Sequence, residues 1–474
     1  MISGKILKSH GWPEGKIIGL AKAAAESLQR TGLEQDAILV WLEGVRVEPG
    51  RYLSDPMFAE LARECLRRAK PVVSEEDEQP REQPLSYASW GDDLVDREAR
   101  SQMENALRLP VAVAGALMPD AHVGYGLPIG GVLATAEAVI PYAVGVDIGC
   151  RMRLSLFEVS PIVLGQRKKQ FAQALLDRTR FGLREGWGRG DLPEHQVLDD
   201  PAWKATRLLK SLQNKAQYQL GTSGSGNHFV EWGTFRLYAD DEQLGLKAGE
   251  YLALLSHSGS RGVGFKIANT YSQLAANEHA RLDPSLRHLA WLSLSSEAGQ
   301  EYWLSMELAG RFASANHAVI HQRVASAAGV RAASHVENFH NYAWPEVLAD
   351  GSPVIVHRKG ATPAAEGELG IIPGSMGDGG YVVRGRGESR SLNSASHGAG
   401  RRMSRRAALG SITKTARDAY LRERGITLLG GAIDESPQAY KDVESVLAAQ
   451  HDLVEVVGKF TPRVVRMADE AGEF

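Results

Sequence analysis

The sequence contains very little cysteine and has no long apolar run. Cys65 and Cys150 are the two cysteines among 474 residues, which excludes a disulfide framework and favours a reducing, cytoplasmic location. The start of the chain lacks the apolar core of a signal peptide. No segment approaches the roughly 20 consecutive apolar residues of a membrane-spanning helix, so no membrane partner is expected.

The chain also carries almost no net charge. Its 54 basic and 57 acidic residues give a formal net charge of -3, so overall charge predicts neither nucleic-acid nor membrane binding. A polyanionic partner would therefore need local basic patches. The composition, 43% hydrophobic and 23% charged, is that of an ordinary globular protein. A chain of this length can bury a large core in two or three domains.

Residues 1–71 are predicted to form a small N-terminal accessory module of the α/β type. Residues 17–29 have helical character, the apolar run AILVW at residues 37–41 resembles a strand, and Asp55 followed by Pro56 is typical of a helix start. Residues 72–90 include the acidic, proline-bearing segment SEEDEQPREQP, which is typical of an exposed linker. Residues 91–474 are then the main domain.

The main domain begins with a glycine-rich stretch at residues 118–150, MPDAHVGYGLPIGGVLATAEAVIPYAVGVDIGC. Glycines allow sharp turns and a close approach of the backbone to a ligand. An acidic residue and a histidine, Asp120 and His122, lie near its start. At its end Asp147 and Cys150 are three residues apart, and on a tight turn both can reach one metal ion. A buried sheet with turns is the commoner interpretation of such a stretch.

Five histidines follow, each at the end of a glycine-rich or strand-like segment. They are His228, His257, His340, His357 and His397. Any one of them is more often structural than a ligand, but the first three, with Asp147 and Cys150, supply the donors of a one- or two-metal site. By softness alone the thiolate favours zinc over manganese. His317 and His321 share a helix face but have no acidic partner in register.

His397 lies in a block of locally positive charge, SASHGAGRRMSR. Its arginines are Arg401, Arg402 and Arg405, and Arg406 follows directly. An imidazole can attack phosphorus, and nearby cations stabilise the charge that develops. The pattern predicts metal-assisted phosphoryl chemistry. Short strands mixed with long helices, without regular β-α-β alternation, predict an α+β fold.

Several blocks occur in the order found in the RtcB family of RNA-splicing ligases. They are MPDAHVGYGLPIGG, GVDIGC, GTSGSGNHFVE, SHSGSRG, VHRKGAT, IPGSMG and SHGAGRRMSR, followed by DESPQAYKDVESV. The similarity runs from about Asp92 to about Arg466, and a chance match over so many ordered blocks is improbable. The resemblance implies an RtcB-like fold, with β-sheets and flanking helices around a metal-bearing cleft.

The resemblance also implies an activity. Members of this family join RNA that ends in a 2′,3′-cyclic phosphate or 3′-phosphate to RNA with a 5′-hydroxyl end, in tRNA splicing or RNA repair, using GTP and Mn²⁺. An archease-like activator is a further candidate partner. Two alternatives stay open. One is a metal-dependent RNA end-processing enzyme, either a cyclic phosphodiesterase or a 3′-end nucleotide-capping enzyme, and the other is a non-catalytic RNA-binding homologue.

The resemblance assigns roles to individual residues. His397 would be the nucleophile that carries GMP. Two Mn²⁺ ions would be held by Asp147, Cys150, His228, His257 and His340; for manganese on a thiolate, the family match outweighs the softness argument. The nucleotide would be contacted by Asn227, Glu231, Asn341, Ser375, His397, Gly398, Ala399, Gly400 and Tyr440. Phosphates of the RNA or nucleotide would be contacted by Arg261, Arg358, Lys359, Arg401 and Arg405.

The chain departs from the family pattern at several positions. The metal motif usually reads Asp-x-Asn-Cys-Gly, but here a bulky cation, Arg151, follows Cys150. Gly380 replaces a serine that contacts the nucleotide, and Asp378 stands where a small neutral residue is usual. The terminal lysine of the family is missing or replaced by Arg466. These changes leave metal ligands and nucleophile intact, question the choice of GTP over ATP, and indicate a divergent branch specialised for RNA repair.

Overall fold

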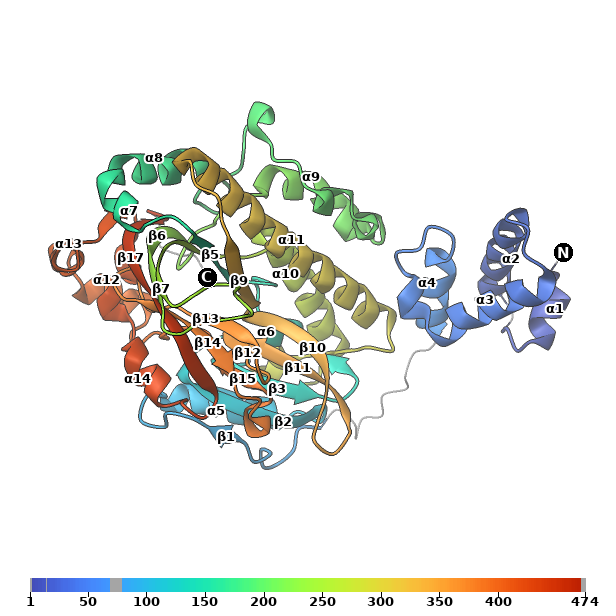
Figure 1. Ribbon diagram of the computed structural model, residues 1–474. Helices are drawn as coiled ribbons and strands as arrows, with labels where there is room; N and C mark the ends of the chain where they lie inside the picture. Colours follow the sequence, from blue (N-terminus) through green and yellow to red (C-terminus); the bar gives the residue numbers. More distant parts are fainter. Residues whose placement is uncertain (1, 14, 69–78, 470–474) are drawn as a thin grey trace.

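The computed structural model describes residues 2–13, 15–68 and 79–469. Two β-sheets with helices around them make up the larger part of the molecule, and four N-terminal helices lie to one side (Figure 1). This mixture of sheets and helices confirms the predicted α+β class. Among the described residues, none of the helices has the length and apolar character needed to cross a membrane.

The N-terminal helices pack around an apolar cluster of their own. They are α1 (Gly4–Ser9), α2 (Lys16–Arg30), α3 (Gln35–Val47) and α4 (Ala59–Arg68), with a 3-10 turn at Pro49–Tyr52. The predicted strand at residues 37–41 is wrong, because these residues lie inside α3. Ile38, Leu42 and Val45 face the cluster at helical spacing, and a short apolar run fits a buried helix as well as a strand. The described part of the module is therefore helical rather than α/β.

The predicted linker lies partly within the larger part of the molecule. The backbone N–H of Arg81 donates to Arg108 O at 2.7 Å, and β1 (Ala88–Ser89) pairs with β2 (Ala112–His122). Residues 69–78, which include the first acidic residues of the linker, lie outside the described residues. The domain boundaries at residues 71 and 91 stay predictions.

The glycine-rich stretch forms the centre of a five-stranded sheet. Its strand order is β1-β2-β3-β11-β10. The strands besides β1 and β2 are β3 (Ile129–Thr135), β10 (Asn341–Val347) and β11 (Pro353–Lys359). Helix α5 (Arg97–Leu107) packs on β2 through Met103 and Leu107, which belong to the same apolar cluster as Leu117 and Leu133.

The second sheet has eight strands and carries most of the candidate metal ligands. Its order is β13-β14-β17-β6-β7-β5-β9, and β16 pairs with β17. The bounds are β5 (Arg151–Phe157), β6 (Phe229–Leu237), β7 (Gly249–Ser258), β9 (Ser334–Phe339), β13 (Leu369–Ile372), β14 (Gly380–Gly385), β16 (Thr427–Leu429) and β17 (Val454–Met467). Two short pairs complete the strands, β4 (Ala138–Val139) with β8 (Leu292–Ser293), and β12 (Ala361–Pro363) with β15 (Ser394–Ser396).

Two helices, α8 (Lys168–Arg178) and α11 (Glu297–Ala328), contact strands of the second sheet. The long α11 contacts β5 and β7 and ends at Gly329, whose φ of 70° is the left-handed conformation that favours glycine. The others are α6 (Pro141–Val144), α7 (Ile162–Gln166), α9 (Arg207–Gln219), α10 (Arg261–Glu278), α12 (Arg405–Ser411), α13 (Lys414–Glu423) and α14 (Val443–Ala448).

The two sheets meet at His340. β9 of the eight-stranded sheet ends at Phe339, and β10 of the five-stranded sheet begins at Asn341. His340 is the one residue between them. Its backbone is therefore fixed on one side by a strand of the eight-stranded sheet and on the other by a strand of the five-stranded sheet. The candidate site is built around this junction.

Candidate active site

The metal-ligand candidates gather at one end of the eight-stranded sheet. The antiparallel register places Arg151 opposite both Ser258 and Phe339, and Phe229 opposite His257. The start of β5, the start of β6 and the ends of β7 and β9 therefore coincide. The candidates at these points are Cys150 before β5, His228 before β6, His257 in β7 and His340 after β9.

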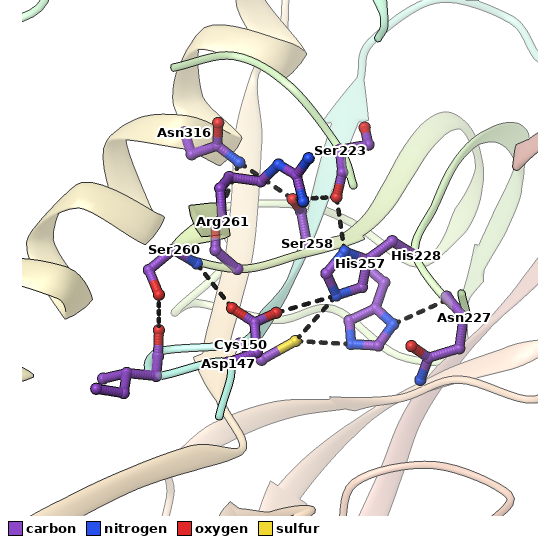
Figure 2. A network of polar contacts seen from close by, with 12 residues as sticks. Asp147, Cys150, Ser223, Asn227, His228, His257, Ser258, Ser260, Arg261 and Asn316 are labelled. Carbon is purple, nitrogen blue, oxygen red and sulfur yellow. Dashed lines mark hydrogen bonds and ion pairs between the residues drawn. The ribbon is translucent and has the colours of Figure 1, made fainter. Parts of the chain in front are cut away.

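Their ligand atoms form two overlapping groups. The Cys150 Sγ atom lies 3.1 Å from His257 Nε2 and 3.5 Å from His228 Nε2, and His257 Nε2 lies 3.1 Å from His340 Nε2. Asp147 Oδ2 is 3.2 Å from His228 Nε2 (Figure 2). Within each group, Cys150–His257–His340 and Asp147–Cys150–His228, one ligand atom of every residue lies within 4.8 Å of the others. Cys150 belongs to both groups.

Backbone carbonyls fix the orientation of the imidazoles. His228 Nδ1 donates to Ser223 O at 2.6 Å, and His257 Nδ1 donates to Asn227 O at 3.2 Å. Because a carbonyl can only accept, each Nε2 carries a lone pair turned toward the centre. Burial lowers the pKa of His257 and of His340 well below the ordinary value, which keeps both neutral. Neutral imidazole lone pairs converging on one point are the arrangement that a metal ion stabilises.

The acidic ligands complete a suitable donor set. Burial, followed by the charge of Asp147, raises the pKa of the Cys150 thiol well above its ordinary value, so a metal ion must displace a proton to bind it. Burial opposes ionisation of Asp147, but the neighbouring His228, followed by the charge of Arg261, keeps the pKa of Asp147 below the ordinary value. Asp147 Oδ1 also accepts from Ser260 N at 3.1 Å. Oxygen, nitrogen and sulfur donors together fit divalent transition-metal ions.

His397 lies beside this centre, directly after β15. Its ring centroid is 5.1 Å from that of His340. His397 Nδ1 donates to Asp120 Oδ2 at 2.7 Å, and the same oxygen accepts from the backbone N–H groups of His397 (3.1 Å) and Gly398 (3.3 Å). Asp120 is fully buried. Burial opposes its charge, yet the attraction of His397 holds the pKa of Asp120 below its ordinary value. The Nε2 of His397 is then left with its lone pair.

The role of Asp120 was missed by the sequence analysis, because 277 residues separate it from His397. Lys441 was also missed. Its Nζ donates to Ala121 O at 2.8 Å and to Pro119 O at 3.2 Å, which holds the segment around Asp120 in place. The one available signal was that both residues fall inside blocks shared with the RtcB family, MPDAHV and AYKDV.

The loop after His397 needs glycine at residue 400. Gly400 has a φ of 72°, and a Cβ there would overlap the carbonyl oxygen of Asp120. Ala399 N donates to Pro373 O at 3.0 Å, and Lys441 N donates to Gly400 O at 2.9 Å. Backbone hydrogen bonds to two other segments therefore hold the loop against the end of β2.

The nucleotide candidates differ in how free their side chains are. Glu231 of β6 is buried, and burial raises its pKa well above the ordinary value. Asn341 accepts from Gly360 N at 2.8 Å through its side-chain oxygen. Asn227 is exposed, and its carbonyl holds His257. Ser375 donates to Asp378 Oδ2 at 2.5 Å.

One of the phosphate candidates, Arg261, lies near the centre, beside Asp147 and Cys150, and a second, Lys359, donates through Nζ to Tyr125 O. Arg261 has a φ of 58° and donates to Thr222 Oγ1 (3.0 Å) and Gly182 O (2.7 Å). Burial lowers its pKa to about 10, against the opposing charges of Asp147 and Cys150. Lys359 is buried, and burial lowers its pKa to about 7.

Carboxylates already hold the arginines that follow His397. Arg405 forms ion pairs with Asp434 and Glu435. Arg401 donates to Asp434 O at 2.8 Å, pairs with Glu435, and lies over the Tyr440 ring. The Tyr440 hydroxyl donates to the same Glu435. These contacts order the basic block into a fixed surface rather than a set of free cations.

Arg358 does not meet the expected phosphate contact. It is 2% exposed and pairs with Glu346 at 2.6 Å. It also donates to Ser394 Oγ at 2.7 Å and lies over the Trp344 ring. All these partners lie inside the protein, so Arg358 stabilises the five-stranded sheet against β15.

The structure shows where the side chains lie at two positions that depart from the family pattern. Arg151 turns away from the metal ligands, toward Phe339 and Glu337. Arg466 pairs with Val230, whereas Glu231 pairs with Val465, so Arg466 and Glu231 lie on opposite faces of the sheet. The side chain of Arg466 therefore points away from the face that carries Glu231.

The pair His317 and His321 is not a second metal site. His317 contacts Ser256 Oγ and Ser258 O, and His321 contacts Ser256 Oγ and Ser155 Oγ. Both histidines are buried by these hydroxyls under the eight-stranded sheet. Their role is in packing, as the missing acidic partner in the sequence suggested.

A family model described as tRNA-splicing ligase RtcB matches residues 102–468. The chain belongs to the RtcB family. The RNA-splicing ligase RtcB of Escherichia coli (strain K12) is 35% identical over 392 residues, which cover 77% of this chain and 92% of that protein. The tRNA-splicing ligase RtcB of Nanoarchaeum equitans is 32% identical over 454 residues, covering 80% and 94%. The resemblance found in the sequence blocks is confirmed, and the N-terminal helices precede the region that the RtcB model matches.

Proposed function

We propose that this RtcB-family protein is an RNA ligase that joins RNA 2′,3′-cyclic phosphate or 3′-phosphate ends to 5′-hydroxyl ends, in RNA repair or tRNA splicing. The observation that carries the proposal is the pair Asp120–His397 next to the metal-ligand groups. An imidazole held at Nδ1 by a buried carboxylate presents Nε2 as a nucleophile. The names of the curated relatives support the same reaction class.

In this proposal His397 Nε2 attacks the α-phosphorus of GTP. A nitrogen–phosphorus bond forms, the bond to pyrophosphate breaks, and GMP stays on His397. Asp120 accepts the hydrogen bond from His397 Nδ1, so the proton stays on that nitrogen. The carboxylate also stabilises the positive charge that the ring acquires. The RNA 3′-phosphate then takes GMP from His397, and the 5′-hydroxyl displaces GMP to close the RNA strand. A cyclic phosphate is hydrolysed to a 3′-phosphate first.

The two ligand groups would hold two divalent ions, which we propose to be Mn²⁺ as in the family. Bound there, such ions would neutralise phosphate charge and align the displacement. Arg261, which lies beside Asp147 and Cys150, and the buried Lys359, whose Nζ donates to Tyr125 O, are the proposed phosphate contacts. Arg401 and Arg405, held by Asp434 and Glu435, would border the path of the RNA. The buried Glu231 is the proposed acceptor for the base, and an archease-like activator stays a candidate partner.

A nucleotidylation assay tests this proposal. The protein is incubated with Mn²⁺ and α-labelled GTP or ATP and run on a denaturing gel beside His397→Ala. We expect acid-labile label on the wild type and none on His397→Ala, because a phosphoramidate forms only on that imidazole. The better donor decides whether the altered pocket still selects guanine.

The absence of label with either nucleotide, on metal-loaded protein, would overturn the ligase proposal. The remaining candidates would then be a metal phosphodiesterase, recognised by hydrolysis of a 2′,3′-cyclic phosphate RNA without nucleotide, and a non-catalytic RNA-binding homologue. Label that accumulates at RNA 3′ ends without joining would identify a capping enzyme.

A further inference from the structure

Asn316 of helix α11 is a fully buried polar side chain that lies outside both metal-ligand groups. Its Oδ1 accepts from the backbone N–H groups of Gly221 (2.7 Å) and Thr222 (3.1 Å). Its Nδ2 donates to Thr222 O at 2.9 Å and to Ser258 Oγ at 3.1 Å (Figure 2). Because a backbone N–H can only donate, the amide oxygen must face Gly221 and Thr222, which fixes the orientation of the amide.

The first segment that Asn316 holds leads to His228. The Nδ1 atom of His228 donates to Ser223 O at 2.6 Å, and Ser223 follows Thr222 directly. Ser258 Oγ, which accepts from Asn316, donates to the same Ser223 O at 2.9 Å. The carbonyl that orients the His228 ring is therefore supported by Asn316 along two routes, the backbone of Thr222 and the hydroxyl of Ser258.

The second segment that Asn316 holds leads to Asp147. Ser260 N donates to Asp147 Oδ1 at 3.1 Å, and Asn316 holds the start of this segment through Ser258. Asp147 and His228 belong to the same ligand group. We call it the Asp147 group, and its members are Asp147, Cys150 and His228. One side chain of α11 thus supports two of its three members.

The other ligand group has supports of its own. We call it the His340 group, and its members are Cys150, His257 and His340. The backbone of His257 is paired on both sides within the sheet, with Met152 of β5 and Phe229 of β6. His340 is fixed between β9 and β10. The hydrogen bonds of Asn316 to the described residues include none to His257 or His340.

The segment before His228 comes close enough to α11 for these bonds because residue 221 is glycine. Gly221 has a φ of 74°, and a Cβ there would lie 2.5 Å from Val319 Cγ1 on the next turn of α11. On its other side, Trp187 Nε1 donates to Gly221 O at 3.2 Å. The turn is thus packed directly on the helix that carries Asn316.

We propose that Asn316 is a positioning residue that sets the affinity of the Asp147 group, and not of the His340 group, for a divalent ion. The inference rests on the two-ion site of the proposed function. An amide suits this position because it supplies one acceptor for two backbone N–H groups and two donors for a carbonyl and a hydroxyl. Replacing a residue that orients metal ligands from outside typically weakens metal binding about 10- to 100-fold.

A Mn²⁺ titration of the full chain tests the proposal without nucleotide or RNA, with free Mn²⁺ measured by electron paramagnetic resonance. Two backgrounds separate the groups: His340→Ala removes a donor from the His340 group, and His228→Ala removes one from the Asp147 group. Asn316→Leu keeps the volume of the side chain and removes the amide. In the His340→Ala background we expect it to raise the dissociation constant about 10- to 100-fold. In the His228→Ala background the constant should stay within about twofold, as for sites that share no partner.

Val324→Ala is the control matched for loss of stability. Val324 is a fully buried residue of the same helix that packs with Phe157 and Phe171. Its truncation should lower the melting temperature and leave the dissociation constants of both backgrounds unchanged. Ser258→Ala removes the hydroxyl between Asn316 Nδ2 and Ser223 O. It serves if Asn316→Leu fails to fold, and should weaken Mn²⁺ binding in the His340→Ala background in the same direction.

Two results would overturn the inference. One is an equal rise of the dissociation constant in both backgrounds, which would assign Asn316 to general stability. The other is an unchanged constant in the His340→Ala background of a folded Asn316→Leu or Ser258→Ala protein. The ligase proposal is judged separately: a wild-type protein that binds Mn²⁺ but takes no nucleotide label would end that proposal, while the affinities would still decide the role of Asn316.

Discussion

Asp120 holds the side chain and the backbone of His397 at the same time. One oxygen, Oδ2, accepts from Nδ1 and from two successive backbone N–H groups. The imidazole can therefore neither rotate nor exchange its protonated nitrogen without losing a bond to a buried carboxylate. In the proposed reaction, such a carboxylate fixes the tautomer of His397 and would stabilise the charged ring that forms when Nε2 attacks.

Asp120→Asn should therefore slow nucleotidylation with little loss of structure. The amide oxygen can take the place of Oδ2 and accept from the same three N–H groups, but a neutral amide stabilises the positive charge of the reacting ring far less than a carboxylate does. We expect the rate of label transfer to fall by about 10²- to 10⁴-fold, as in triads where the carboxylate is replaced by an amide. The rate is measured under single-turnover conditions between pH 6 and 9.

The pH profile separates positioning from simple damage. Loss of the carboxylate charge lowers the rate and changes its pH dependence while the melting temperature stays close to that of the wild type. A uniform drop that follows a lowered melting temperature, or an unchanged rate, would contradict the positioning role.

Among individual residues, the sequence predicted the candidate metal ligands but not the residues that position His397 and its surroundings. The motif blocks identified Asp147, Cys150 and the three histidines, and the structure brings all five together. Asp120 and Lys441 act through contacts across 277 and 320 residues, and spacing along the chain carries no information about such pairs. The placement of Arg358 shows the opposite error, because a basic residue in a family block can be buried for packing.

Helix α11 and the eight-stranded sheet are joined by a chain of buried hydrogen bonds. Because His317 Nε2 meets the Ser258 carbonyl at 3.0 Å, that nitrogen carries the proton, and Nδ1 accepts from Ser256 Oγ at 2.7 Å. Ser256 Oγ in turn accepts from His321 Nε2 at 2.7 Å. His321 Nδ1 then accepts from Ser155 Oγ at 2.8 Å. Burial lowers the pKa of both histidines well below the ordinary value, so the chain is neutral and fully satisfied.

Ser256→Ala removes the hydroxyl that stands between the two histidines. It leaves one donor and one acceptor unpaired in the interior, and each unsatisfied group costs ~1–3 kcal/mol. We expect the free energy of unfolding to fall by about 2–4 kcal/mol, measured by urea unfolding followed by circular dichroism.

Ser326→Ala, an exposed serine on the same helix, is the control and should change the free energy of unfolding by less than about 0.5 kcal/mol. A Ser256→Ala protein as stable as this control would show that the hydrogen-bond chain adds nothing to the attachment of α11.

Two elements show why hydrophobic periodicity alone did not predict the secondary structure. The run AILVW in α3 has no alternation and is too short to distinguish a helix from a strand, and the packing of Ile38 and Leu42 decides for a helix. β17 is a 14-residue strand in the middle of the second sheet. Its register shifts between Pro462 and Val464, so no strict period-2 pattern marks it in the sequence. That strand also decides the side on which Arg466 lies.

For the molecule as a whole, the N-terminal helices form a nearly separate unit. Their apolar cluster is closed on itself, and the described contacts with the larger part are centred on Leu304 and on Arg63, which lies 3.8 Å from Glu301. They precede the region that the RtcB model matches. The candidate active site draws none of its residues from them.

Removal of residues 1–78 should therefore leave nucleotidylation within about twofold of the full-length rate, because units that share few contacts fold and act independently. The rate is measured with the better nucleotide donor, and the melting temperature of the shortened chain is compared with that of the intact protein. Loss of label transfer in a shortened protein that still melts cooperatively would contradict this independence and assign the helices a part in the reaction.

The single sulfur atom shared by the two ligand groups makes the centre vulnerable at one point. Replacing a histidine removes a donor from one group, whereas oxidation of Cys150 to a sulfenic acid would remove the common donor of both. The second cysteine of the chain, Cys65, is buried in the N-terminal helical cluster, far along the sequence from any thiol exchange with Cys150. Oxidative damage at this atom would thus silence the whole centre in one event, and recovery would depend on an external reductant.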